Sequence, residues 1–204
     1  MNTVLVNGSP LTPSKIVCIG RNYVAHIKEL GNEIPDEMVV FNKPNSAISE
    51  SLHSVLLDDA LHYESELCFI VRDGGFGAVG FGLDLTKRAL QSTLKQKGLP
   101  WERAKAFDGA VVFSPFVALP QTPETLSLTL TVDGATRQSG GVELMMYKPG
   151  TILQELEKFM SLEDGDIVMT GTPAGVGPVL AGEQFEGKVL AGDDVLVCQS
   201  WIAR

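Results

Sequence analysis

The feature that most constrains the fold is a strand-like run carrying two carboxylates. Residues 62–71 are rich in β-branched and aromatic side chains and are followed by turn residues. Side chains alternate faces along a strand, so His62, Glu64 and Glu66 should share one face, about 7 Å apart at each step. Two carboxylates entering a core are costly unless a cation neutralises them. With Asp84 nearby and few basic neighbours in sequence, the pattern predicts a divalent metal site with oxygen ligands, suited to Mg²⁺, Mn²⁺ or Ca²⁺.

Each of these acids also has a simpler interpretation. Glu64 and Glu66 could face solvent on an edge strand, as polar residues at a period of two usually do. Asp84 could cap a helix that begins near Thr86. The metal interpretation is favoured when the three acids are taken together, because both strands would aim them at one point.

Length, charge and cysteine content narrow the class of protein. The 204 residues predict a single domain over residues 1–204, with residues 1–14 as a short N-terminal extension. A net charge of −9 argues against nucleic acid or a membrane as partner, because either needs a basic surface. No apolar run is long enough to span a membrane, and the N-terminus does not resemble a signal peptide. Cys18, Cys68 and Cys198 lie among apolar residues, so we expect buried thiols in a reducing compartment and a cytoplasmic protein.

The remaining pattern favours a β-rich α+β fold, because strands outnumber helices without regular alternation. A polar, proline-containing stretch at residues 32–38 is expected to be a mobile loop. Helices are expected at 21–31, from 86 to 98 and at 152–160. Besides 62–71, strands are expected at 4–6, 15–20, 39–44, 77–85, 111–113, 126–132, 166–170 and 195–201.

Two further pairs of residues could carry chemistry. His26 and Glu29 are three residues apart, hence on one face if helical, and a Glu–His pair can orient and deprotonate a water molecule. The alternative is an exposed helix bearing unrelated polar residues. Lys43 and Lys105 are flanked by apolar residues, so each could hold an anionic substrate or simply reach the surface.

The loop from Thr170 to Pro178 is rich in glycine and proline. It lacks the lysine of a phosphate-binding loop. Its backbone amides and the Thr172 hydroxyl could hold a carboxylate, and the alternative is a purely structural turn.

Taken in their order along the chain, these segments resemble the fumarylacetoacetate hydrolase family, particularly its small acylpyruvate hydrolase and oxaloacetate decarboxylase branch. The resemblance runs from Ile16 to about Val197. It implies one catalytic domain with a rolled mixed β-sheet and a few peripheral helices, commonly assembled as a homodimer. The motifs that carry it are Gly20-Arg21-Asn22-Tyr23, Phe41-Asn42-Lys43-Pro44, Tyr63-Glu64-Ser65-Glu66-Leu67, Gly82-Leu83-Asp84-Leu85-Thr86, the stretch from Lys97 to Gly109, and the stretch from Gly165 to Gly177.

The same resemblance implies roles for individual residues. Lys105 would contact substrate oxygens beside the metal, and His26 and Glu29 would activate water from a lid over the ligand. The implied ligands of Mg²⁺ or Mn²⁺ are Glu64, Glu66 and Asp84. The implied substrate-binding residues are Arg21, Lys43, Gly171 and Thr172.

The implied function is a divalent-metal-dependent hydrolase that cleaves a carbon–carbon bond of 2,4-dioxo acids (acylpyruvates), with oxaloacetate decarboxylation as a companion activity. One alternative is an isomerase or decarboxylase of 2-oxo or 2-hydroxy-dienoic diacids in aromatic catabolism. Another is a non-catalytic ligand-binding protein. The pair of His26 and Glu29 argues against the last, because binding alone requires no base.

Overall fold

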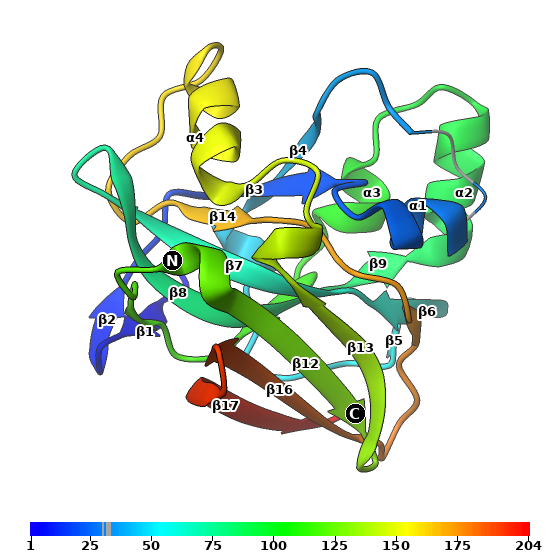
Figure 1. The fold of residues 1–204 in the computed structure, drawn as a ribbon. Helices are drawn as coiled ribbons and strands as arrows, with labels where there is room; N and C mark the ends of the chain where they lie inside the picture. Colours follow the sequence, from blue (N-terminus) through cyan, green and yellow to red (C-terminus); the bar gives the residue numbers. More distant parts are fainter. Residues whose placement is uncertain (30, 32–33) are drawn as a thin grey trace.

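The chain is organised around a strongly curled, seven-stranded mixed sheet (Figure 1). The computed structural model describes residues 1–29, 31 and 34–204. The main path of the sheet runs in the order β10-β8-β7-β14-β3-β4, and β11 pairs with β8. Only β14 and β3 pair in parallel among these described strands. The bounds are β3 Lys15–Gly20, β4 Val39–Pro44, β7 Ser65–Arg72, β8 Gly75–Asp84, β10 Val111–Phe113, β11 Val117–Ala118 and β14 Ile167–Met169.

A second, four-stranded antiparallel sheet packs against the first and runs in the order β13-β12-β16-β17. Its strands are β12 Leu126–Val132, β13 Ala135–Gly141, β16 Gln184–Ala191 and β17 Asp194–Ile202. Two short strands form a hairpin: β1 Val4–Val6 and β2 Ser9–Leu11. A further small sheet consists of β5 Val55–Leu56, β6 Asp59–Tyr63, β9 Thr86–Lys87 and β15 Gly177–Pro178.

Helices lie around the sheets, and no helix in the described residues is long and apolar enough to cross a membrane (Figure 1). The α-helices are α1 Val24–Glu29, α2 Arg88–Gln96, α3 Glu102–Lys105 and α4 Pro149–Glu157. Three 3-10 helices are η1 Asn45–Ala47, η2 Pro123–Thr125 and η3 Val142–Leu144.

The main core fills the space between the two sheets. Strand β12 shows strict alternation, with every second side chain buried against the larger sheet. Phe81 of β8 packs closely against Gly187 of β16, and a Cβ added at Gly187 would lie 2.3 Å from the Phe81 ring. The predicted β-rich α+β fold with a rolled mixed sheet is thereby confirmed.

Most of the predicted strands are present, while several short elements, among them β2, β5, β11, β15 and α3, were not predicted. The predicted strand 62–71 is interrupted at Glu64, which lies between β6 and β7. Strand β16 was not predicted, because Gly187 and its charged neighbours obscure its alternation. Cys198 is exposed rather than buried, because it faces outward on β17, whereas Cys18 and Cys68 are buried as expected. Positions 32 and 33 of the predicted loop lie outside the described residues.

A buried carboxylate fixes the start of β14, the strand that leads into the 170–178 loop. Asp166 accepts hydrogen bonds from Ser14 Oγ at 2.6 Å and from the Glu163 amide at 2.8 Å, and it pairs with Lys15 at the start of β3. Burial alone would raise the pKa of Asp166, but these hydrogen bonds outweigh it and hold the pKa below its usual value. The loop therefore leaves the sheet from an anchored position.

Candidate functional site

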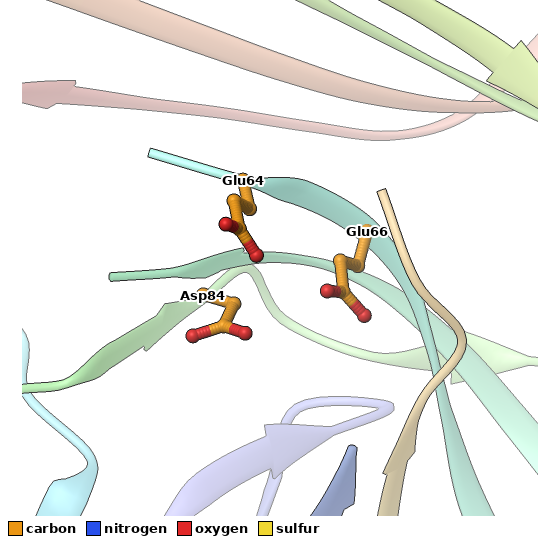
Figure 2. A group of neighbouring side chains, drawn as sticks. All are labelled: Glu64, Glu66 and Asp84. Atoms are coloured by element: carbon orange, nitrogen blue, oxygen red, sulfur yellow. The ribbon is translucent and has the colours of Figure 1, made fainter. Parts of the chain in front are cut away.

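Three buried carboxylates meet where β7 and β8 pair (Figure 2). Glu64 and Asp84 exchange backbone hydrogen bonds of 3.1 and 2.8 Å, which places their side chains side by side, and Glu66 follows on the same face. One oxygen from each of the three lies within 4.8 Å of the others. Strand β7 is central, between β8 and β14, and the residue capping α2 is Lys87. The edge-strand and helix-cap interpretations are therefore wrong.

Cationic side chains surround these acids, so the expectation of few basic neighbours was wrong. Lys105 Nζ lies 2.8 Å from Glu64 Oε2, 2.7 Å from Asp84 Oδ2 and 2.6 Å from the Thr86 hydroxyl. Arg88 contacts the other oxygen of Glu64. Lys105 comes from α3, far along the chain from Glu64, whereas Arg88 is the first residue of α2 and closely follows Asp84 in sequence.

Lys43 and Lys105 are both buried, which excludes a surface role for either. Lys43 Nζ lies 2.8 Å from Asp84 Oδ1 and donates to the backbone carbonyl of Lys105. Lys43 therefore contacts both Asp84 and the backbone of Lys105, but it does not line the cavity.

The pKa values of Glu64 and Glu66 are shifted in opposite directions. Burial alone would raise the pKa of Glu64, but Lys105 and Arg88 hold it far below its usual value. Burial, together with the charge of Asp84, raises the pKa of Glu66 well above its usual value, although the Gly171 amide donates to Glu66 at 2.7 Å. Glu66 is thus the carboxylate that the side-chain cations compensate least.

The residues present fit a hard divalent cation. All the charged donors are carboxylate oxygens, the ligands that Mg²⁺ and Mn²⁺ prefer. Asp84 Oδ1 is buried and has no hydrogen bond within the described part of the chain, although Lys43 lies beside it. A cation bound among the three acids would neutralise Glu66, the carboxylate that the side-chain cations compensate least.

A small cavity of about 30 Å³ opens onto the carboxylates. This volume has room for about two water molecules, so a small organic acid can enter only if the walls part. Glu29 and Gly171, like Lys43, do not line it. The sequence-predicted residues that do line it are Arg21, His26, Glu64, Glu66, Asp84, Lys105 and Thr172.

The predicted His26 and Glu29 pair is present on α1. His26 Nδ1 lies 3.1 Å from Glu29 Oε2, and the Gly175 amide donates to Glu29 Oε1 at 3.0 Å. Because Glu29 can only accept, Nδ1 carries the proton, and Nε2 of a neutral ring keeps its lone pair. His26 itself lines the cavity, whereas Glu29 does not.

One face of α2 carries cavity-lining residues that were not predicted from the sequence. Arg88, Gln91 and Lys95 all line the cavity, and their spacing of three and four residues is the helical signal that would have found them. Lys95 Nζ lies 4.6 Å from the centroid of the Trp101 ring. Burial, followed by the charge of Arg21, lowers the pKa of Lys95 to about 8.

The fold and the site define a β-rich α+β protein with a candidate metal centre in a small cavity. The profile described as Fumarylacetoacetate (FAA) hydrolase C-terminal matches residues 15–201. The chain belongs to the fumarylacetoacetate hydrolase family.

Similar proteins include oxaloacetate tautomerases and a fumarylpyruvate hydrolase. The chain is 39% identical to the mitochondrial oxaloacetate tautomerase of Arabidopsis thaliana, over 89% of each sequence. It is 36% identical to the oxaloacetate tautomerase of Escherichia coli K12, over 87% of this chain and 90% of that one. Among solved structures, a fumarylpyruvate hydrolase from Pseudomonas aeruginosa in complex with Mn²⁺ and pyruvate is similar, with a TM-score of 0.88, 30% identity and coverage of 99% and 95%.

The metal assignment is testable with Glu64→Gln, which keeps the side-chain shape but removes the charge that Lys105 and Arg88 now share. We expect a folded protein whose affinity for Mn²⁺ falls by more than about 100-fold, beyond the usual loss for groups that merely support ligands. Calorimetric titration with Mn²⁺ measures this. The control is Glu50→Gln, an exposed residue outside the cavity, which should leave the affinity unchanged. Wild-type affinity in the Glu64 variant would refute the assignment.

Proposed function

We propose that this protein is a divalent-metal-dependent tautomerase that interconverts the enol and keto forms of oxaloacetate. The observation that carries the proposal is the placement of a base, His26, at the same cavity as the buried carboxylates and Lys105. A keto–enol exchange needs a group that moves a proton at carbon 3 and positive charge near the oxygen on carbon 2. The two tautomerase relatives, aligned over most of their lengths, support the choice of substrate.

Glu64, Glu66 and Asp84 would hold Mg²⁺ or Mn²⁺. When bound, the ion supplies Lewis acidity for the oxygens of a 2-oxo acid. The Mn²⁺ of the similar hydrolase structure supports this class of ion.

The chain's own residues divide the remaining work. Lys105 holds positive charge next to the carboxylates, where negative charge develops on the enolate oxygen. His26 Nε2 takes a proton from carbon 3 of the keto form and delivers it to the oxygen on carbon 2 to give the enol, and the reverse transfer restores the keto form. Glu29 keeps the ring oriented and stabilises its charged form. The Thr172 hydroxyl, which lines the same cavity, binds the carboxylate on carbon 1.

Oxaloacetate carries a second carboxylate, and the cavity has cationic residues to receive it. Arg21 and Lys95 line the cavity, and Lys95 stacks on Trp101. The lowered pKa of Lys95 reflects a buried, electropositive environment, in which an anionic ligand is favoured. We assign the carboxylate on carbon 4 to this end of the cavity.

Acylpyruvate hydrolysis is the second candidate, supported by the likeness to a fumarylpyruvate hydrolase. In that reaction His26 would take a proton from water, which attacks the carbonyl at carbon 4. The bond between carbons 3 and 4 then breaks, giving pyruvate and a carboxylic acid. Oxaloacetate decarboxylation would need neither the attacking water nor removal of a proton from carbon 3.

The role of His26 separates these reactions. With Mg²⁺ or Mn²⁺ present, His26→Ala should lower kcat for enol–keto exchange of oxaloacetate by about 10²–10⁴-fold, because a positioned base is lost. If the wild type hydrolyses acylpyruvates, kcat for that reaction should fall to a similar extent. The kcat for decarboxylation should fall far less. The assay follows decay of the enol's ultraviolet absorbance, with pyruvate release measured in parallel.

The matched control is His53→Ala, which removes a histidine outside the cavity. A loss seen mainly in KM would instead indicate a binding role for His26. Wild-type kcat for enol–keto exchange in the His26 variant would exclude it as the base. Absence of enol–keto exchange by the metal-loaded wild type would refute the proposed function.

Lys95→Met tests the second carboxylate. KM for oxaloacetate should rise about 10-fold, the lower end for losing a hydrogen bond to a charged group, while KM for an acylpyruvate with an uncharged acyl group stays unchanged. Lys95 is charged below its pKa of about 8, so wild-type KM for oxaloacetate should also rise as pH increases through that value. Lys97→Met, an exposed neighbour, is the control. Equal changes in KM for both substrates would contradict the assignment.

We also propose that the protein is a homodimer. The family resemblance supports this, as do the exposed apolar side chains Val195 and Ile202 on β17. Sedimentation at micromolar concentration should give twice the 21.9 kDa of one chain. A mass of one chain at all concentrations would contradict it.

A further inference from the structure

One buried polar side chain outside the cavity links the carboxylates to the 170–178 loop. Gln138 lies on β13 of the second sheet and is 1% exposed. We propose that Gln138 is a positioning residue that makes the Thr172 hydroxyl an obligate hydrogen-bond donor toward the cavity, so that this wall selects a ligand carboxylate. The proposal rests on the proposed function only in taking the ligand to be a 2-oxo acid.

The orientation of the Gln138 amide is fixed by two backbone groups. Its Oε1 accepts a hydrogen bond of 2.9 Å from the Ser65 amide, and its Nε2 donates one of 2.8 Å to the Pro173 carbonyl. A backbone N–H can only donate and a carbonyl can only accept. Turning the amide end for end would set a donor against a donor and an acceptor against an acceptor, so one orientation is allowed.

This orientation dictates what the Thr172 hydroxyl can do. Gln138 Nε2 lies 2.8 Å from Thr172 Oγ1, and an amide nitrogen of this kind only donates. The hydroxyl oxygen therefore accepts, and its own proton must go elsewhere. The nearest acceptor for it among the described contacts of Thr172 is the Pro173 carbonyl at 3.4 Å, which is long for an O–H···O bond and already accepts from Gln138.

This proton of Thr172 is available to a ligand, because Thr172 lines the cavity. A hydroxyl that donates to a carboxylate forms a charge-assisted hydrogen bond, about twice as strong as a neutral one. A ligand group that could only donate would meet a second donor at this wall. The position thus favours a ligand group that accepts, above all an ionised carboxylate, over one that can only donate.

The surrounding backbone holds Gln138 and the loop in register. A Cβ at Gly175, which has a φ of +101°, would lie 2.0 Å from the Arg137 carbonyl, and a Cβ at Gly140 would lie 2.8 Å from Pro173. The loop therefore packs directly against β13 on both sides of Gln138. Ser65, the other partner of Gln138, lies between Glu64 and Glu66.

The test is a double-mutant cycle with pyruvate as the probe, in Mn²⁺-loaded protein. Thr172→Val should weaken pyruvate binding by about 10-fold or more, as expected for a lost hydrogen bond to a charged group. Gln138→Met, which keeps the length but no hydrogen bond, should weaken it to a similar extent. The double variant should bind no more weakly than Thr172→Val alone, because the two residues act in series. Calorimetry measures the affinities for pyruvate and Mn²⁺.

Two controls bound the interpretation. Thr172→Ser keeps the hydroxyl and should retain pyruvate affinity, and Gln184→Met, at an exposed position of β16, should change nothing. Thermal melts verify folding. If the methionine variant does not fold, Gln138→Glu replaces it under the same criteria, because it keeps an acceptor for Ser65 and loses the amide donor.

Four results would overturn the proposal: unchanged pyruvate affinity in the Gln138 variant, losses that multiply in the double variant, an equal loss of Mn²⁺ affinity, or no pyruvate binding by the wild type. Because binding is measured without turnover, these results are independent of the oxaloacetate assay. A protein that binds pyruvate as expected but does not exchange enol and keto oxaloacetate would refute the proposed function alone.

Discussion

The site depends on the backbone pairing of Glu64 with Asp84, which sets like charges side by side in a buried place. The two residues exchange hydrogen bonds at the point where β6 ends and β7 begins, so neither side chain can move away without breaking the sheet. Burying such charges without partners would be strongly unfavourable. Lys105 therefore has to lie between them, and its burial and that of Lys43 follow from the same requirement.

The surrounding structure brings distant segments to this point. Helix α1 contributes His26, α2 contributes Arg88, and the loop after β14 contributes Thr172. The second sheet, which carries no cavity-lining residue in the described structure, still reaches the site through Gln138. The two sheets are thus joined by specific polar contacts as well as by their shared apolar core.

The sequence allowed the carboxylates to be predicted because alternation along one strand and one neighbouring turn suffice to bring them together. Lys43 and Lys105 were named as candidates, but their direct pairing with Glu64 and Asp84 was not predicted, since antiparallel register and helix docking decide which lysine meets which acid. The face of α2 was visible as a helical spacing of Arg88, Gln91 and Lys95 but was read only for its apolar residues. Gln138 gave no signal at all, because an isolated glutamine in a strand is ordinary until its three partners are known. Cys198 shows the converse error, since apolar neighbours along the sequence do not decide which face a strand residue takes.

The small volume of the cavity has a kinetic meaning. With room for about two waters, the cavity is smaller than an organic acid, so a ligand needs the wall to part. Helix α1, six residues long, carries part of that wall and is tied to the facing loop by the bonds of Glu29 to the Gly175 amide. For the tautomerase proposed above, this latch would open and close in every cycle. Its lifetime would then set an upper limit on turnover, and an enolate inside would be shielded from solvent protons for as long as the latch holds.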